Sequence, residues 1–290
     1  MDLTFEIVAG RSGDPIEGLA WDGEALLFSR PDNNLIQRFD PAQGAVSDFR
    51  RYTNHTSGLA FAPSGELYAC QQLSRRIVRF NRNGSTTPMP YRFADGNYHN
   101  MPRHLAIDRQ SRIWFSDSIH PLPAYGPPVP FPGHQSVLRL EPLADRSWSL
   151  QRLTFDTVHP GGLALSPDGS TLYVAEEGEH GAELWAYRVL PDTRLGPPAI
   201  LHSFGPYRGI EGMCVTAEGM IIACAGVAAS GPGALVYVFA PNGRPLATYA
   251  LPEGTPAVCA FGEADASTLF VGTAEGHLYR VRGTGHRGQT

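Results

Sequence analysis

"G-G-L-A-L-S-P-D-G-S-T-L-Y-V-A-E", residues 161–176, contains a short apolar stretch, a turn of Ser, Pro, Asp and Gly, and a second apolar stretch. Two such stretches around a turn of this composition are typical of a β-hairpin. The same pattern recurs along the chain, at intervals of 40, 46, 58, 50 and 45 residues. Its copies begin at Glu17, Ser57, Arg103, Gly161, Glu211 and Pro256.

Each copy is followed by another alternating pair of stretches, for example residues 35–40 with residues 45–50. Four strands in about 45 residues, repeated six times, predict an all-β fold, a six-bladed β-propeller with four antiparallel strands in each blade. Only three strands follow the start of the last copy, so we expect residues 3–9 to supply the outer strand of the last blade and close the ring. Residues 1–290 then form a single domain.

A proline-rich segment, residues 119–134, makes the third interval the longest. We expect it to join the second and third strands of blade three as a stiff flap that lines a pocket with Tyr125, Phe131, His120 or His134. A simple excursion over the surface is the alternative. We expect the C-terminal tail, residues 283–290, to be disordered.

The composition excludes several classes of function. The net charge is −5 and the basic residues form no cluster larger than a pair, so we expect no nucleic-acid partner. All 23 basic residues are arginine, which excludes a lysine-anchored pyridoxal phosphate, and we expect no nucleotide cofactor. Apolar runs are only strand-sized and residues 1–10 lack the features of a signal peptide, so we expect a cytoplasmic protein that does not enter a membrane.

The first residue of each copy opens the innermost strand of a blade, at one mouth of the central channel. Glu17, Arg103 and Glu211 belong to blades one, three and five, so ring closure brings them into one charged cup. Charged side chains that converge in a concave site often have shifted pKa values, and such sites are often catalytic. We therefore predict Glu17, Arg103 and Glu211 as catalytic residues, while pairing among themselves is the structural alternative.

Five further residues are predicted to bind the substrate. His104 and His159 lie within two residues of the ring positions 103 and 161, and Asn100 and Asp117 flank the hairpin of blade three. Tyr125 lies on the flap. Hydrogen bonding within the protein is the alternative role for these side chains.

The chain resembles the SMP-30/gluconolactonase/LRE-like family over nearly its whole length. Besides the opening segment, the resemblance lies in "E-G-L-A-W-D-G" (17–23), "P-D-N-N-L-I-Q-R-F-D-P" (31–41), "R-I-W-F-S-D" (112–117) and "L-P-E-G-T-P-A-V-C-A-F-G" (251–262). It implies a six-bladed propeller and, in many members, a lactonase or related hydrolase. It also implies one divalent metal in the channel, held by a Glu, an Asn and an Asp, with another Asn nearby.

This sequence departs from the family pattern at the metal positions. Glu17 stands where the metal-binding Glu stands, and Glu211 replaces the usual Asp. Gly161 stands in place of the Asn ligand, and Arg103-His104 stand in place of an Asn-Asp pair. Two neutral oxygen ligands are therefore replaced by a glycine and a permanent cation.

The exchange makes a metal doubtful. A hard divalent ion requires six or more oxygen ligands, and a nearby guanidinium repels it. We predict that Arg103 takes over part of the electrostatic role of the metal. The alternative is one divalent ion (Ca, Mg, Mn, Zn or Fe) held by Glu17, Glu211 and a histidine, His104 or His159.

Three functions follow as hypotheses. The first is hydrolysis of a lactone or related cyclic ester or amide, with one Glu positioning or deprotonating water and Arg103 or a metal stabilising the oxyanion. The second is a metal-independent cyclase, isomerase, dehydratase or condensing enzyme of specialised metabolism, with Arg103 anchoring an anionic substrate. The third is a non-catalytic propeller that binds a small ligand. In each, we expect a small-molecule partner and a monomer or small homo-oligomer.

Overall fold

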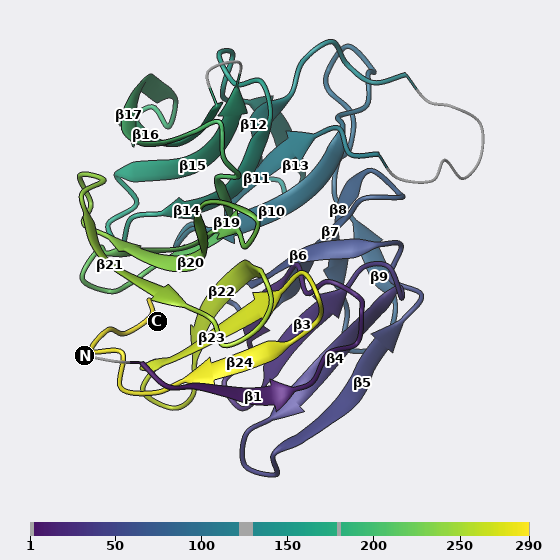
Figure 1. Ribbon diagram of the computed structural model, residues 1–290. Coiled ribbons are helices and arrows are strands. Elements are labelled where there is room, and N and C mark those ends of the chain that lie inside the picture. The colour runs from purple at the N-terminus through teal and green to yellow at the C-terminus, as the bar shows by residue number, and fades with distance from the viewer. Residues whose placement is uncertain (1–2, 122–129, 179–180, 290) are drawn as a thin grey trace.

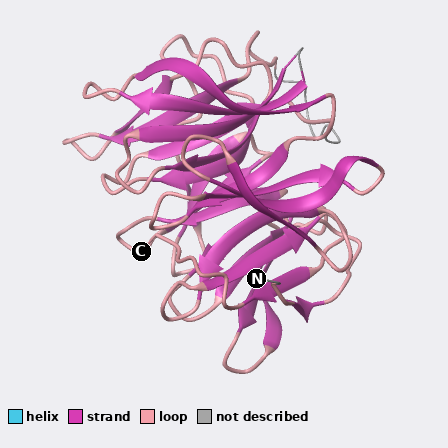
Figure 2. Ribbon diagram, turned by 60° about the vertical axis from the view of Figure 1, so that its left-hand side comes forward, coloured by secondary structure: helices cyan, strands magenta, loops and turns pink. Residues whose placement is uncertain are grey.

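A computed structural model describes residues 3–121, 130–178 and 181–289. Throughout these residues every regular element is a β-strand, as Figure 2 shows, and none forms a helix that could cross a membrane. Strands β1 to β24 form six four-stranded antiparallel sheets arranged in a ring (Figure 1). The prediction of a six-bladed β-propeller is confirmed.

Each of the first five blades uses four consecutive strands, numbered from the channel outward. The strands of blades one to three are β2 (Leu19–Trp21), β3 (Leu26–Arg30), β4 (Leu35–Asp40) and β5 (Ala45–Arg51); β6 (Thr56–Phe61), β7 (Leu67–Gln71), β8 (Arg76–Phe80) and β9 (Thr86–Pro88); β10 (Met101–Ile107), β11 (Ile113–Ser118), β12 (Ser136–Pro142) and β13 (Trp148–Arg152).

The remaining blades follow the same order, except that the last one borrows its outer strand from the N-terminus. Their strands are β14 (Pro160–Leu165), β15 (Thr171–Gly178), β16 (Gly181–Val189) and β17 (Leu195–Gly205); β18 (Ile210–Val215), β19 (Ile221–Val227), β20 (Ser230–Phe239) and β21 (Pro245–Ala250); β22 (Pro256–Gly262), β23 (Thr268–Thr273), β24 (Leu278–Val281) and β1 (Phe5–Ala9).

The ring closes where the two ends of the chain meet, as predicted. β1 pairs antiparallel with β24, with Phe5 opposite Val281, and the two strands lie side by side in Figure 1. The buried apolar side chains form clusters between the facing sheets of neighbouring blades, including blades six and one. Burial of this surface is the main force that holds the blades together.

A bulge near the start of the inner strand sets the direction of the ring residues. The pairing of β10 with β11 shifts register between Pro102 and Leu105, and corresponding shifts occur in blades two, four, five and six. Bulges bend a strand and re-aim its side chains. They explain how Arg103 and Glu211 turn toward the axis while the rest of each strand stays in its sheet.

The glycine after the ring residue lets neighbouring blades approach closely. A Cβ at Gly58 would lie 2.6 Å from the carbonyl oxygen of Arg103, and one at Gly18 would lie 2.2 Å from that of Ser57. Gly162 and Gly212 are as crowded by the backbone of the next blade. The repeated x-Gly pair therefore combines a functional position with a packing requirement.

Gly58→Ala is expected to destabilise the fold by about 1–3 kcal/mol, because backbone atoms rather than a flexible side chain must move. The free energy of unfolding in denaturant measures this change. Gly10→Ala is the matched control, since nothing lies within 4 Å of its Cβ position. Equal stability of the two variants would contradict the packing role of Gly58.

The described part of the C-terminal tail, residues 283–289, which we expected to be disordered, makes hydrogen bonds at the channel mouth opposite the ring residues. The amide of Gly288 donates to the carbonyl of Ala266 at 2.7 Å. The side chain of Gln289 donates to the carbonyls of Leu165 and Val215, at 3.0 and 3.3 Å. The tail thus connects the inner strands of blades four and five with a hairpin of blade six.

Candidate functional site

The charged cup forms as predicted at the starts of the inner strands. The Nη2 atom of Arg103 forms an ion pair with Glu211 Oε1 and lies 3.5 Å from Glu17 Oε1. All three side chains are mostly buried, with exposures of 16–20%. One guanidinium from blade three therefore bridges two carboxylates from blades one and five.

Arg208 is a second cation of the cup that sequence reasoning did not single out. Its Nη2 atom lies 2.8 Å from Glu211 Oε2, and its Nη1 atom donates to the carbonyl of Gly226 at 2.8 Å. Arg208 precedes Glu211 by three residues, so it approaches the same carboxylate from outside the strand. Its proximity to a ring position was the available signal.

The two carboxylates of the cup have opposite pKa shifts. Burial raises the pKa of Glu17; the attraction of Arg103 lowers it only in part, and the nearby charge of Glu211 adds to the rise. Burial also acts to raise the pKa of Glu211, but Arg103 and Arg208 outweigh it and lower that pKa to about 2. Divergent pKa values in one site separate a proton-exchanging carboxyl from a permanently ionised one.

Glu17 also has a free oxygen. Its Oε2 atom is buried and has no hydrogen-bond partner among the described residues. A buried polar atom without a partner is costly unless a ligand or water satisfies it. Glu17 is therefore the carboxyl group of the cup that keeps an oxygen for a further hydrogen bond.

Two histidines lie beside these charges. Burial and the neighbouring Arg103 lower the pKa of His104 to about 3, and its buried Nε2 atom has no hydrogen-bond partner among the described residues. Burial likewise lowers the pKa of His159, whose Nδ1 atom lies 3.0 Å from Gln135 Oε1. Both imidazoles are neutral at neutral pH and can donate or accept hydrogen bonds.

Asn100 and Asp117 occupy a buried network within blade three. Neither has exposed surface. Asp117 Oδ1 lies 2.8 Å from His99 Nδ1, its Oδ2 accepts from the amide of Asn100 at 2.6 Å, and the Asn100 side chain donates to the carbonyl of His134 at 2.7 Å. These bonds hold the chain just before Arg103 in place, and direct contact with a substrate stays a prediction.

The proline-rich segment joins β11 to β12, as expected. Tyr125 and the neighbouring residues 122–129 lie outside the described part of the chain. Phe131 is exposed and stacks under the guanidinium of Arg75, at 4.4 Å from the ring centre. His120 faces His159, with 5.4 Å between the ring centres.

Two adjoining hollows open at the cup. The larger, of about 490 Å³, has a volume within the range of small-molecule sites. The smaller measures about 30 Å³. Both are lined by Glu211 and by Glu177, a carboxylate at the end of β15 that sequence reasoning also missed.

The residues of the cup do not fit a divalent metal. The described residues contain no group of three or more His, Cys, Asp and Glu side chains placed to hold an ion. The carboxylates that would serve as ligands, Glu17 and Glu211, instead flank the guanidinium of Arg103. A metal held by these two residues and His104 or His159 therefore has no support in the geometry.

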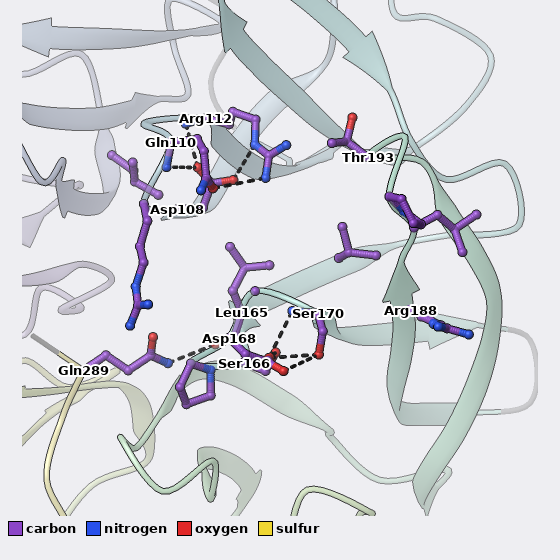
Figure 3. Close-up of a pocket in the computed structure, with 17 residues that line it drawn as sticks. Asp108, Gln110, Arg112, Leu165, Ser166, Asp168, Ser170, Arg188, Thr193 and Gln289 are labelled. Atoms are coloured by element: carbon purple, nitrogen blue, oxygen red, sulfur yellow. Dashed lines mark hydrogen bonds and ion pairs between the residues drawn. The ribbon is translucent and has the colours of Figure 1, made fainter.

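A third pocket, of about 600 Å³, lies between blades three and four at the opposite mouth of the channel (Figure 3). Its carboxylates already have partners: Asp108 binds Arg112, and Asp168 accepts from Ser166 and Ser170. These are hydrogen bonds within turns. Both carboxylates of this pocket are therefore engaged within turns, whereas Glu17 of the cup has an oxygen without a partner among the described residues.

Fold and site together define a class, the six-bladed propellers with a charged cup at one channel mouth. Residues 16–275 match the model of the SMP-30/Gluconolactonase/LRE-like region, and the chain belongs to this family. It is 28% identical over 296 residues to a gluconolactonase of Zymomonas mobilis, an alignment that covers 92% of this chain and 78% of the relative.

Solved structures show the same likeness. A gluconolactonase from Xanthomonas campestris superposes with a TM-score of 0.83 at 28% identity, with 97% of this chain and 89% of that chain covered. A second structure, described as a putative gluconolactonase, gives a TM-score of 0.83 at 25% identity, with 99% and 94% covered.

Proposed function

We propose that the protein is a hydrolase that opens a lactone in the charged cup, without a divalent metal. The observation that carries the proposal is the position of Arg103 between Glu17 and Glu211. The gluconolactonases to which the chain is similar support the reaction class. A cytoplasmic location stays a prediction from the sequence.

Arg103 is suited to stabilise the oxyanion. Its contacts with the two carboxylates both use Nη2, so Nε and Nη1 have no protein partner in the described structure. When water adds to the lactone carbonyl, negative charge develops on the carbonyl oxygen. In many such reactions, fixed donors aimed at that oxygen in a buried site contribute more to stabilising the transition state than any other single effect.

Glu17 is suited to supply the proton. Ring opening breaks the bond between the carbonyl carbon and the ring oxygen, and the departing oxygen takes up a proton to become a hydroxyl. Burial favours the protonated form of Glu17, and its Oε2 atom is free to donate. Glu211 stays ionised and holds Arg103 and Arg208 in position.

The charges of the cup favour an uncharged substrate. Glu211 already pairs with both Arg103 and Arg208, and Glu177 adds another carboxylate at the mouth. An anionic substrate would therefore compete with carboxylates of the protein for the arginines. We propose a neutral lactone as the substrate.

The first experiment measures ring opening of a panel of neutral and carboxylate-bearing lactones, with and without prior treatment with a chelator. We expect turnover of at least one neutral lactone, with rates that change by less than about twofold after chelation. Loss of activity after chelation, restored by one divalent metal, would contradict the metal-free mechanism. If no lactone is opened, the alternative of a metal-independent cyclase, isomerase, dehydratase or condensing enzyme takes precedence.

A further inference from the structure

Gly161 leaves a small cavity in the wall of the cup. It is the ring position of blade four and carries no side chain. The cavity measures about 30 Å³ and is lined by Arg103, His159, Gly161, Ala175, Glu177, Ile210 and Glu211. A Cβ built on Gly161 would lie 3.7 Å from the carbonyl oxygen of Ile210 and 3.8 Å from the Cβ of Ala175. The space is therefore large enough for a methyl group but is closely bounded.

The size and polarity of this cavity suit one water molecule. A buried water needs roughly 10–15 Å³ of space and two to four polar partners. Arg103 can donate to it, and Glu177 and Glu211 can accept from it. The last two residues also line the neighbouring hollow of about 490 Å³, so a water here lies next to that hollow as well as to Arg103.

His159 is held so that one ring nitrogen can accept a proton. Its Nδ1 atom lies 3.0 Å from Oε1 of Gln135, an acceptor, so Nδ1 carries the hydrogen and Nε2 carries a lone pair. The backbone is fixed as well, because Glu176 Oε1 accepts from the amides of Val158 and His159, each at 2.7 Å. The imidazole therefore has a defined tautomer and a fixed starting point at the cavity wall.

We propose that the Gly161 cavity binds the water that attacks the lactone and that Nε2 of His159 takes its proton. The inference rests on the proposed hydrolase function. The water oxygen forms the new bond to the carbonyl carbon, one water proton passes to His159, and the ring oxygen leaves with the proton of Glu17. The product is the open hydroxy acid; the His159 proton then returns to solvent, and Glu17 takes up a proton from solvent.

Gly161→Ala tests the proposal, because the added methyl group occupies the water position with little strain. We expect kcat to fall at least about tenfold while KM changes by less than about twofold and the melting temperature is unchanged. Gly196→Ala on β17 is the matched control: its Cβ would lie 3.6 Å from the nearest atom, and β17 is the outermost strand of the same blade. Full activity of Gly161→Ala would overturn the proposal.

A crystal structure of the wild-type protein gives an independent test. We expect an ordered water within hydrogen-bond distance of His159 and Glu211, and its loss in Gly161→Ala. A dry cavity would overturn the water site whatever the activity. If the wild-type protein opens no lactone, the proposed function fails and the crystal structure alone decides the water site. If Glu17→Gln abolishes activity but Gly161→Ala does not, only the water site fails.

Discussion

Replacing Arg103 with alanine is expected to lower kcat/KM for a lactone by about a thousandfold, because the change removes the proposed oxyanion donor. It also leaves Glu17 and Glu211 facing each other, and neighbouring carboxylates raise one another's pKa. Steady-state kinetics across a range of pH measures both effects. Addition of guanidinium ion to the variant is expected to restore part of the activity, which a purely structural role would not produce.

Two controls separate chemistry from folding in this experiment. Arg194→Ala removes an exposed arginine of the outer surface and is expected to leave kinetics unchanged. Removing one partner of a buried ion pair costs about 3–5 kcal/mol of stability. The folding of the Arg103→Ala variant is therefore checked by circular dichroism and thermal unfolding. A folded Arg103→Ala variant with wild-type activity would contradict the mechanism.

Glu17→Gln is expected to lower kcat by about 10²–10⁴-fold, because the amide keeps the size of the carboxyl but cannot donate its proton. Activity in the wild-type protein should fall as the pH rises through the raised pKa of Glu17, since only the protonated form donates. The variant should lose this alkaline limb. A pH series of kcat at saturating substrate measures it.

The stability of the same variant gives a second readout with a definite sign. Because the pKa of Glu17 is raised in the folded state, its contribution to stability is lost as the pH rises through that value. A neutral glutamine removes this loss, so the variant should be at least as stable as the wild-type protein at neutral pH. Glu24→Gln, at an exposed side chain, is the control. A Glu17→Gln variant that retains the alkaline limb would assign that limb to another group.

The repeat explains why the fold and three residues of the cup were predictable. Each copy begins at an inner strand, and each inner strand begins at the axis, so Glu17, Arg103 and Glu211 had to converge once the ring closed. The repeat also accounts for Gly58 and its equivalents, which form the close contact between neighbouring blades. Equivalent positions of the repeat, far apart in the sequence, therefore lie close together in the folded ring.

The remaining residues of the site depend on contacts that the repeat does not encode. Arg208 lies before its strand and Glu177 at the end of another, so their approach to the cup follows from pairing between strands. Asn100 and Asp117 adjoin the cup in sequence, but the register that pairs Pro102 with Asp117 turns them into a buried network. The pKa difference between Glu17 and Glu211 depends in part on Arg208, whose contact with Glu211 the repeat did not predict.

A crystal structure with a bound cyclic phosphonate, which mimics the tetrahedral intermediate, tests most directly whether the reaction takes place at the Arg103 guanidinium. We expect a phosphonyl oxygen within hydrogen-bond distance of Arg103 Nε or Nη1 and the ring oxygen near Glu17 Oε2. Binding in the pocket between blades three and four, with the cup left to solvent, would contradict it.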